Sequence, residues 1–162
     1  KGLDDTRNYL YVKKKKPVKM ILNVYKTFKK YGRVVIDFDE ETYTVGKSVY
    51  ENINKYVKFN ELSKLFIQYL DEMKFSNNEY IFSPDQHSRK VPYNNMSAKI
   101  VRAFRKKFPR KNVGIDILRH SYISNFYSQK KRPTRNEKRM VAMMMGHSLD
   151  TQSRYDRVDL DQ

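Results

Sequence analysis

The clearest candidates for chemistry are an arginine, a histidine and a tyrosine in the C-terminal third of the chain. Arg119 stands in the segment LRHSY (118–122), His147 directly follows a glycine, and Tyr155 comes eight residues after His147. Lys26, between a tyrosine and a threonine, adds a cation far upstream. Arginine binds oxyanions through a planar fork of N–H groups, histidine and lysine exchange protons, and tyrosine can act as a nucleophile. Taken singly, these residues also have ordinary explanations: a surface ion pair for Arg119, a helix cap for His147 and a packed ring for Tyr155.

The upstream lysine falls in a region whose composition predicts β-structure. Three short runs rich in β-branched and aromatic residues, 9–12, 20–25 and 33–38, are expected to form strands. Residues 26–32 connect the second and third runs, and Gly32 gives the backbone freedom that a turn needs. Residues 18–38 are therefore predicted to form a hairpin in a small antiparallel sheet, with Lys26 in its basic loop.

The rest of the chain is predicted to be mainly helical, because its apolar residues recur at helical spacing. Two such faces are formed by Val49, Ile53, Tyr56 and Val57, and by Leu62, Leu65, Phe66, Tyr69 and Leu70. Residues 74–93 are expected to be a loop. Four more helices are predicted: one capped by Asn94 or Asn95 and stopping at Pro109, one over 116–127, one from a Thr134–Glu137 capping box to a Gly146 cap, and one over about 150–158.

These elements predict an α+β fold, mainly α-helical with a small antiparallel β-sheet near the N-terminus. The sequence shows no internal repeat and no low-complexity linker. Residues 1–162 are therefore expected to form one mixed domain.

The charge of the chain points to a polyanionic partner. Its 162 residues include 34 Lys and Arg against 18 Asp and Glu, a formal charge of +16, with enough hydrophobic residues (39%) for a folded core. Such a charge favours nucleic acid or an anionic membrane surface. A membrane surface would require one basic amphipathic helix, whereas here the basic residues occur in the separate segments 13–16, 26–33, 102–110 and 130–139. We therefore expect a nucleic-acid-binding protein.

Composition and motifs also argue against cofactor chemistry. The chain has no cysteine, which excludes disulfides, thiolate zinc sites and cysteine nucleophiles, and its histidines, His87, His120 and His147, lack metal-site spacing. The segment VGKS (45–48) matches the end of a phosphate-binding loop, but Glu41 stands where that loop needs its first glycine. No apolar run approaches a membrane span and no secretory leader is visible, so an intracellular, reducing compartment is expected. We expect no metal, nucleotide or other cofactor.

In this order, the candidate residues resemble the catalytic domain of tyrosine recombinases, the phage-integrase family. That family has a first Arg, a Lys in a β-hairpin, a His-x-x-Arg helix, a Gly-His pair and a nucleophilic Tyr near the C-terminus. Here Lys26 matches the hairpin Lys, Arg119 the second Arg, His147 the Gly-His histidine and Tyr155 the nucleophile. The resemblance covers about residues 9–158. The Lys-, Asn- and Tyr-rich sequence around residues 25–32 is similar to recombinases of viruses and virophages with AT-rich genomes.

The resemblance implies a site-specific recombinase or integrase that breaks and rejoins double-stranded DNA through a 3′-phosphotyrosyl intermediate. Tyr155 would attack the phosphate, Arg119 and His147 would stabilise charge on its oxygens, and Lys26 would protonate the departing 5′ oxygen. The phosphotyrosyl link conserves bond energy, so rejoining needs neither ATP nor metal. The family also implies self-assembly on DNA as a synaptic dimer or tetramer.

The chain departs from the family upstream and near its C-terminus. The first Arg is expected at or before Lys1, so the sequence is predicted to be a fragment that lacks this Arg and the DNA-clasping N-terminal domain. Arg7 lies too close to Lys26 to take that place. The spacing from His147 to Tyr155 is one residue shorter than the commonest one.

Asp116 is the third departure, because it stands three residues before Arg119, where the family has His or Lys. On a structural interpretation it is a helix N-cap or a first-turn carboxylate. On a functional one it accepts the Tyr155 proton or orients a neighbouring group. His120, next to Arg119, is expected to pack or brace the site.

Further basic residues are candidates for contacts with the DNA backbone, although a solvated basic face explains each of them equally well. They are Lys29, Lys30, Arg102, Arg105, Lys106, Lys107 and Arg110. Two alternatives to the recombinase remain open. A type IB topoisomerase would share the chemistry but relax supercoils without pairing sites, and a non-catalytic module would merely hold DNA.

Overall fold

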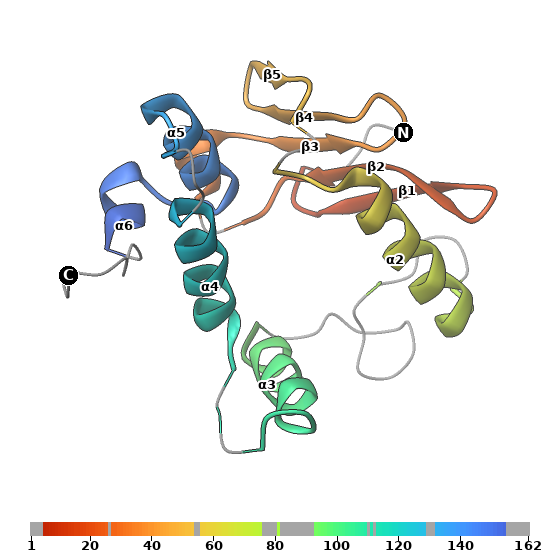
Figure 1. The fold of residues 1–162 in the computed structure, drawn as a ribbon. Helices are drawn as coiled ribbons and strands as arrows, with labels where there is room; N and C mark the ends of the chain where they lie inside the picture. Colours follow the sequence, from red (N-terminus) through yellow and green to blue (C-terminus); the bar gives the residue numbers. More distant parts are fainter. Residues whose placement is uncertain are drawn as a thin grey trace. The chain divides into compact units, whose positions relative to one another are not determined.

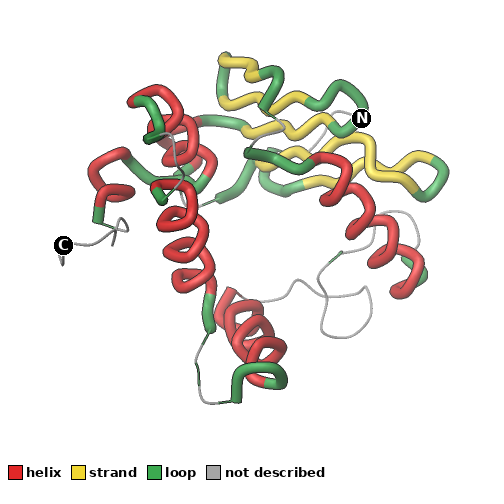
Figure 2. Tube along the Cα trace, in the orientation of Figure 1, coloured by secondary structure: helices red, strands yellow, loops and turns green. Residues whose placement is uncertain are grey.

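A computed structural model describes residues 5–25, 27–53, 56–75, 81, 93–109, 111, 113–128 and 132–154, with the backbone alone for 93–96. The chain divides into two compact units, Lys1–Ile81 and Phe82–Gln162. Figure 1 colours the chain along its sequence from the first unit to the second. An antiparallel sheet is followed by helices (Figure 2), which confirms the predicted α+β class. The expectation of one domain over residues 1–162 stays a prediction. No helix in the described ranges is long and apolar enough to cross a membrane.

The first unit contains a five-stranded sheet in which every strand pairs with the next one along the chain. Its strands are β1 (Tyr9–Lys13), β2 (Lys16–Leu22), β3 (Val34–Asp37), β4 (Thr42–Val45) and β5 (Ser48–Tyr50), and all neighbours are antiparallel. The β2–β3 pairing confirms the predicted hairpin. Its connection contains one helical turn, α1 (Phe28–Tyr31), where the sequence predicts a plain loop.

The VGKS segment is the turn between β4 and β5. Val45 pairs with Ser48, so the hairpin turns in two residues, and Gly46 takes a φ of 58°. A Cβ at this glycine would lie 3.0 Å from the carbonyl oxygen of Tyr31, so glycine is required for space as well as for φ. A strand follows the turn instead of the helix that a phosphate-binding loop needs, which excludes that interpretation.

The helix predicted from Val49, Ile53, Tyr56 and Val57 is wrong. Val49 lies in β5, opposite Thr44 of β4, and Ile53 is buried in the segment that follows. Helical spacing over so few apolar residues does not distinguish a helix from a strand, and the pairing with β4 supplies the backbone hydrogen bonds here.

The second predicted apolar face does form a helix, α2 (Phe59–Met73), which packs against β2 (Figure 1). Phe59 is almost fully buried, and the rings of Phe38 and Phe66 meet edge to face with centroids 6.0 Å apart. Lys15, in the β1–β2 turn, forms a 3.0 Å ion pair with Asp71 of α2. The core of this unit thus lies between α2 and the sheet.

The second unit consists of helices: α3 (Tyr93–Arg105), α4 (Ile115–Tyr127), α5 (Arg135–Met144) and α6 (Leu149–Ser153). The start of α4 matches the prediction to one residue, and the capping box between Thr134 and Glu137 is confirmed. The predicted Asn94 or Asn95 cap is wrong, because α3 begins at Tyr93 and includes both. Most of the predicted 74–93 loop, and residues 155–158 of the last predicted helix, lie outside the described residues.

Asp37, at the end of β3, is a buried carboxylate that holds the sheet and the following turn together. Its side chain forms a 2.8 Å ion pair with Lys19 of β2 and accepts the backbone N–H groups of Asp39 and Glu40 at 3.1 Å. Burial alone would raise the pKa of Asp37. The hydrogen bonds from Lys19 and the two amides outweigh burial and lower this pKa below its ordinary value.

Replacing Asp37 by asparagine should lower the free energy of unfolding by about 2 kcal/mol near neutral pH, since charged hydrogen bonds are lost. A carboxylate with a lowered pKa stabilises the fold above its unfolded pKa, and this contribution disappears as the pH falls through the folded pKa. Urea unfolding at about pH 7 and about pH 2.5 should therefore show the difference between the two proteins shrinking in acid. Asp39→Asn, an exposed neighbour, serves as the control. An equally large difference at both pH values would contradict this role of the carboxylate.

Candidate functional site

His147 is held in place by the end of α5. Gly146 takes a left-handed φ of 72°, its N–H donates to the Met143 carbonyl at 2.9 Å, and the His147 N–H donates to the Ala142 carbonyl at 3.0 Å. This pair of bonds is a Schellman cap, whose left-handed position strongly favours glycine. The predicted Gly146 cap is confirmed, and it explains locally why a glycine precedes this histidine.

Gln152, on α6, joins His147 to the rest of the second unit. The residue is fully buried (0% exposed), and its Oε1 lies 3.3 Å from His147 Nε2. Its amide nitrogen lies 3.2 Å from both the Tyr127 hydroxyl on α4 and the Lys138 carbonyl on α5. One side chain therefore ties together α4, α5, α6 and the segment that carries His147.

Sequence reasoning missed Gln152. Glutamine is mostly an exposed residue, and nothing in its neighbours predicts burial. The available signal was its position between His147 and Tyr155, in the short helix that separates the two candidate catalytic residues.

Arg119 lies in the second turn of α4 beside a carboxylate. Its guanidinium is 3.3 Å from Asp116 Oδ1, and the two side chains are 40% and 79% exposed. The N-cap of α4 is Gly114, so Asp116 is a first-turn carboxylate and not the N-cap. Its contact with Arg119 is an exposed ion pair, the ordinary explanation of Arg119, and both functional roles of Asp116, orienting a neighbouring group and accepting a proton, stay predictions.

Arg119 and His147 act on each other electrostatically. Burial lowers the pKa of His147, the hydrogen bond with Gln152 raises it, and the positive charge of Arg119 lowers it, so that the net shift is downward. The positive charge of Arg119 therefore favours the neutral form of the half-buried His147 imidazole. An anion bound beside them would favour the protonated imidazole and relieve this opposition.

The other two predicted catalytic residues, Lys26 and Tyr155, lie outside the described residues. The chain is described up to Arg154, whose backbone N–H donates to the Thr151 carbonyl at the end of α6. Of the four residues that carry the resemblance, the structure therefore describes Arg119 and His147. His120, on the same helix as Arg119, is half-buried, and His87 lies outside the described residues.

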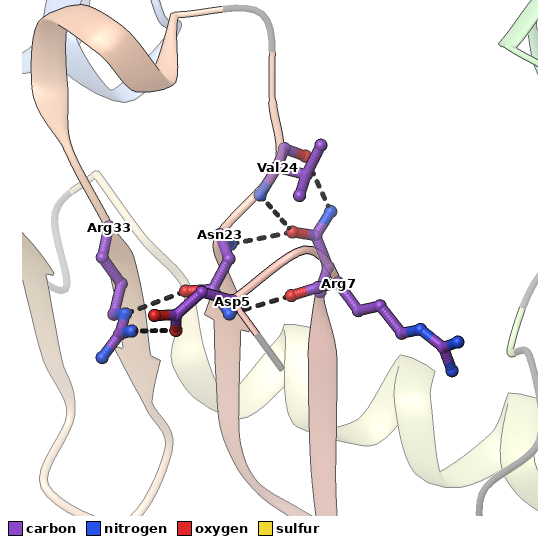
Figure 3. Close-up of polar contacts among 6 residues, drawn as sticks. Asp5, Arg7, Asn23, Val24 and Arg33 are labelled. Carbon is purple, nitrogen blue, oxygen red and sulfur yellow. Dashed lines mark hydrogen bonds and ion pairs between the residues drawn. The ribbon is translucent and has the colours of Figure 1, made fainter. Parts of the chain in front are cut away.

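The strand that leads to Lys26 ends in a polar network (Figure 3). Asn8 Oδ1 accepts the backbone N–H groups of Asn23 and Val24, both at 2.8 Å. The Asn23 side chain is buried, donates to the Arg7 carbonyl and accepts from Arg33 Nε, each at 2.8 Å. These bonds end the β2 ladder at Leu22, three residues before the strand predicted over 20–25 would have ended.

The loop around Lys26 is closed from its two sides. The Tyr25 hydroxyl donates to the Gly32 carbonyl at 2.6 Å, and the Tyr25 ring meets Phe28 edge to face with centroids 5.9 Å apart. Arg33, just after the loop, pairs with Asp5. The residues that flank Lys26 are therefore fixed by hydrogen bonds and ring packing.

The predicted DNA-contacting residues that the structure describes are exposed. Lys29 and Lys30 form the middle of α1, and Lys30 Nζ lies 4.9 Å from the centroid of the Tyr31 ring. Arg102 and Arg105 end α3, with Lys106 and Lys107 in the turn that follows. Arg110 lies outside the described residues. Within the described ranges, no group of three or more His, Cys, Asp or Glu side chains could hold a metal ion.

Comparisons with family models, curated proteins and solved structures returned no match to this chain. Its function has therefore to be inferred from its own residues.

The Asp116–Arg119 pair gives a stability prediction. Asp116→Asn should lower the free energy of unfolding by at most about 1 kcal/mol, because an exposed pair and a first-turn carboxylate each contribute about 0.5 kcal/mol. Urea unfolding measures the loss, and Glu61→Gln in the first turn of α2 is a control for the helix dipole alone. A loss above about 2 kcal/mol would show that Asp116 does more than assist α4 and Arg119 at the surface.

Proposed function

We propose that this chain is the catalytic domain of a DNA strand transferase of the tyrosine-recombinase type, acting as a site-specific recombinase or integrase. The observation that carries the proposal is the placement of His147 by the glycine cap at the end of α5, where the charge of Arg119 on α4 also acts on it. In the sequence, Tyr155 follows two residues after the end of α6. The charge of +16 supports a polyanionic substrate.

In the proposed reaction, the Tyr155 hydroxyl oxygen attacks the scissile phosphorus as its proton passes to solvent water, or to Asp116 on the functional interpretation of that residue. The bond from phosphorus to the 5′ oxygen breaks, and Lys26 gives that oxygen a proton. The guanidinium of Arg119 donates hydrogen bonds to the phosphate oxygens and stabilises the negative charge that concentrates there in the transition state. The reverse sequence with a different 5′ hydroxyl rejoins the strand.

Within the first unit, the residues on both sides of Lys26 are fixed. A proton donor on a flexible side chain is more effective when its backbone is anchored. The hydrogen bond from Tyr25 to Gly32 and the bonds of Asn8 to Asn23 and Val24 hold both ends of the β2–β3 loop.

A non-catalytic DNA-binding module is the second candidate. The exposed basic group at the end of α3, formed by Arg102, Arg105, Lys106 and Lys107, favours it, because this group serves phosphate binding without any catalytic residue. A type IB topoisomerase would use the same catalytic residues, and relaxation of supercoiled plasmid without recombination products distinguishes it.

The catalytic proposal predicts a covalent protein–DNA complex. The full-length protein should become trapped on a pool of nicked duplexes of randomised sequence. Tyr155→Phe should abolish the complex, and Arg119→Ala should slow its formation about 10²- to 10³-fold, since one transition-state donor is lost. Denaturing gels with labelled DNA measure both effects.

Tyr122→Phe on α4 is the matched control and should leave the complex intact. A complex that persists in Tyr155→Phe, or no complex from the full-length wild type, would reject the catalytic proposal.

The backbone contacts predict a salt dependence of DNA affinity. Arg102→Ala should reduce the slope of log affinity against log salt by about 0.9, since one neutralised phosphate is lost on duplex DNA. Fluorescence anisotropy between about 50 and 200 mM salt measures the slope. Lys64→Ala on α2 is the comparison and should leave the slope unchanged. The same slope in wild type and Arg102→Ala would remove the end of α3 from the interface.

A further inference from the structure

The buried Gln152 side chain has one orientation that satisfies its neighbours. An amide has one end that accepts hydrogen bonds and one end that donates them. The Lys138 carbonyl, 3.2 Å away, can only accept, so the amide nitrogen faces it, and the Tyr127 hydroxyl oxygen takes the second N–H at 3.2 Å. The amide oxygen therefore faces His147 Nε2 at 3.3 Å.

This orientation fixes which nitrogen of His147 carries the proton. Because Gln152 Oε1 only accepts, His147 Nε2 must donate to it. A neutral imidazole has a single N–H, so Nδ1 holds the lone pair and is the position that takes a second proton. The other tautomer would place two acceptors against each other beside a fully buried amide, which is costly.

The groups around His147 decide when the second proton binds. Burial and the positive charge of Arg119 on α4 both oppose the second proton. The neutral amide of Gln152 on α6 favours it through its hydrogen bond with His147. From α5, Lys138 reaches this network through its carbonyl, and its ammonium lies 4.5 Å from the centroid of the Tyr127 ring. A phosphate beside Arg119 would add negative charge to a site that otherwise opposes protonation.

We propose that Gln152 is a positioning residue that keeps the proton of His147 on Nε2, so that His147 gains a second proton at Nδ1 when a DNA phosphate binds beside Arg119. The proton comes from solvent. The phosphate step rests on the proposed function, whereas the position of the first proton does not. His147 then becomes a cationic donor after the phosphate has arrived, which adds proton uptake to the donor role expected from the sequence.

Long-range ¹H–¹⁵N NMR of the labelled 162-residue chain tests the proposal without requiring cleavage. In the DNA-free chain near neutral pH, Nε2 of His147 should show the shift of a protonated nitrogen and Nδ1 that of an unprotonated one. A short DNA duplex should raise the pKa of His147, because bound phosphate stabilises its charged form. Gln152→Met should move the tautomers toward the mixture of a free histidine and lower the pKa further, since the hydrogen bond that raises it is gone.

Tyr127→Phe is the matched control, because it removes a different arm of the same network. It should leave the first proton of His147 on Nε2, because the Lys138 carbonyl still orients the Gln152 amide. If Gln152→Met does not fold, the tautomers of wild type and Tyr127→Phe decide. A proton on Nδ1 in the DNA-free wild type overturns the proposal. A proton on Nε2 with no change of the pKa on adding duplex supports the Gln152 role and overturns the phosphate step.

Discussion

The buried amide of Gln152 is the contact that joins α4, α5 and α6 in the second unit. A fully buried polar side chain is tolerated when each of its donors and acceptors is matched, and here the matches come from three different elements. The same bonds set the position of His147 relative to α4, from which Arg119 projects. The ring that is proposed to meet the scissile phosphate is therefore oriented by a fully buried residue.

In the first unit, polar side chains likewise fix a loop, here the one between β2 and β3. The ends of the β2–β3 loop, in which Lys26 stands in the sequence, are fixed by backbone N–H groups that donate to Asn8 and by the hydroxyl of Tyr25. The side-chain oxygen of Asn8 accepts hydrogen bonds from two successive backbone N–H groups. It therefore satisfies these donors where the hydrogen bonds between strands stop. In both units, then, a neutral polar side chain positions the segment that carries a candidate catalytic residue.

Local signals in the sequence were sufficient for α4 and α5, but not for the start of α3. The Thr134–Glu137 capping box and Gly146 act within one or two turns of the chain, so the ends of α5 follow from neighbouring residues alone. The β4–β5 hairpin was missed because strand pairing competes with helical spacing over a short apolar run, and Asp37 and Gln152 because their burial depends on distant elements. The resemblance pointed to Arg119 and His147 as candidates. The hydrogen bonds of Gln152 around His147 became apparent only in the structure.

Mapping the DNA-linked peptide by mass spectrometry is the most direct test that strand transfer passes through Tyr155. The full-length chain is reacted with a nicked duplex, digested with nuclease and protease, and searched for peptides that keep a nucleotide. The peptide that contains Tyr155 should carry a nucleotide joined through its 3′ phosphate. A nucleotide on a different residue, or cleaved DNA with no linked peptide, would contradict this chemistry.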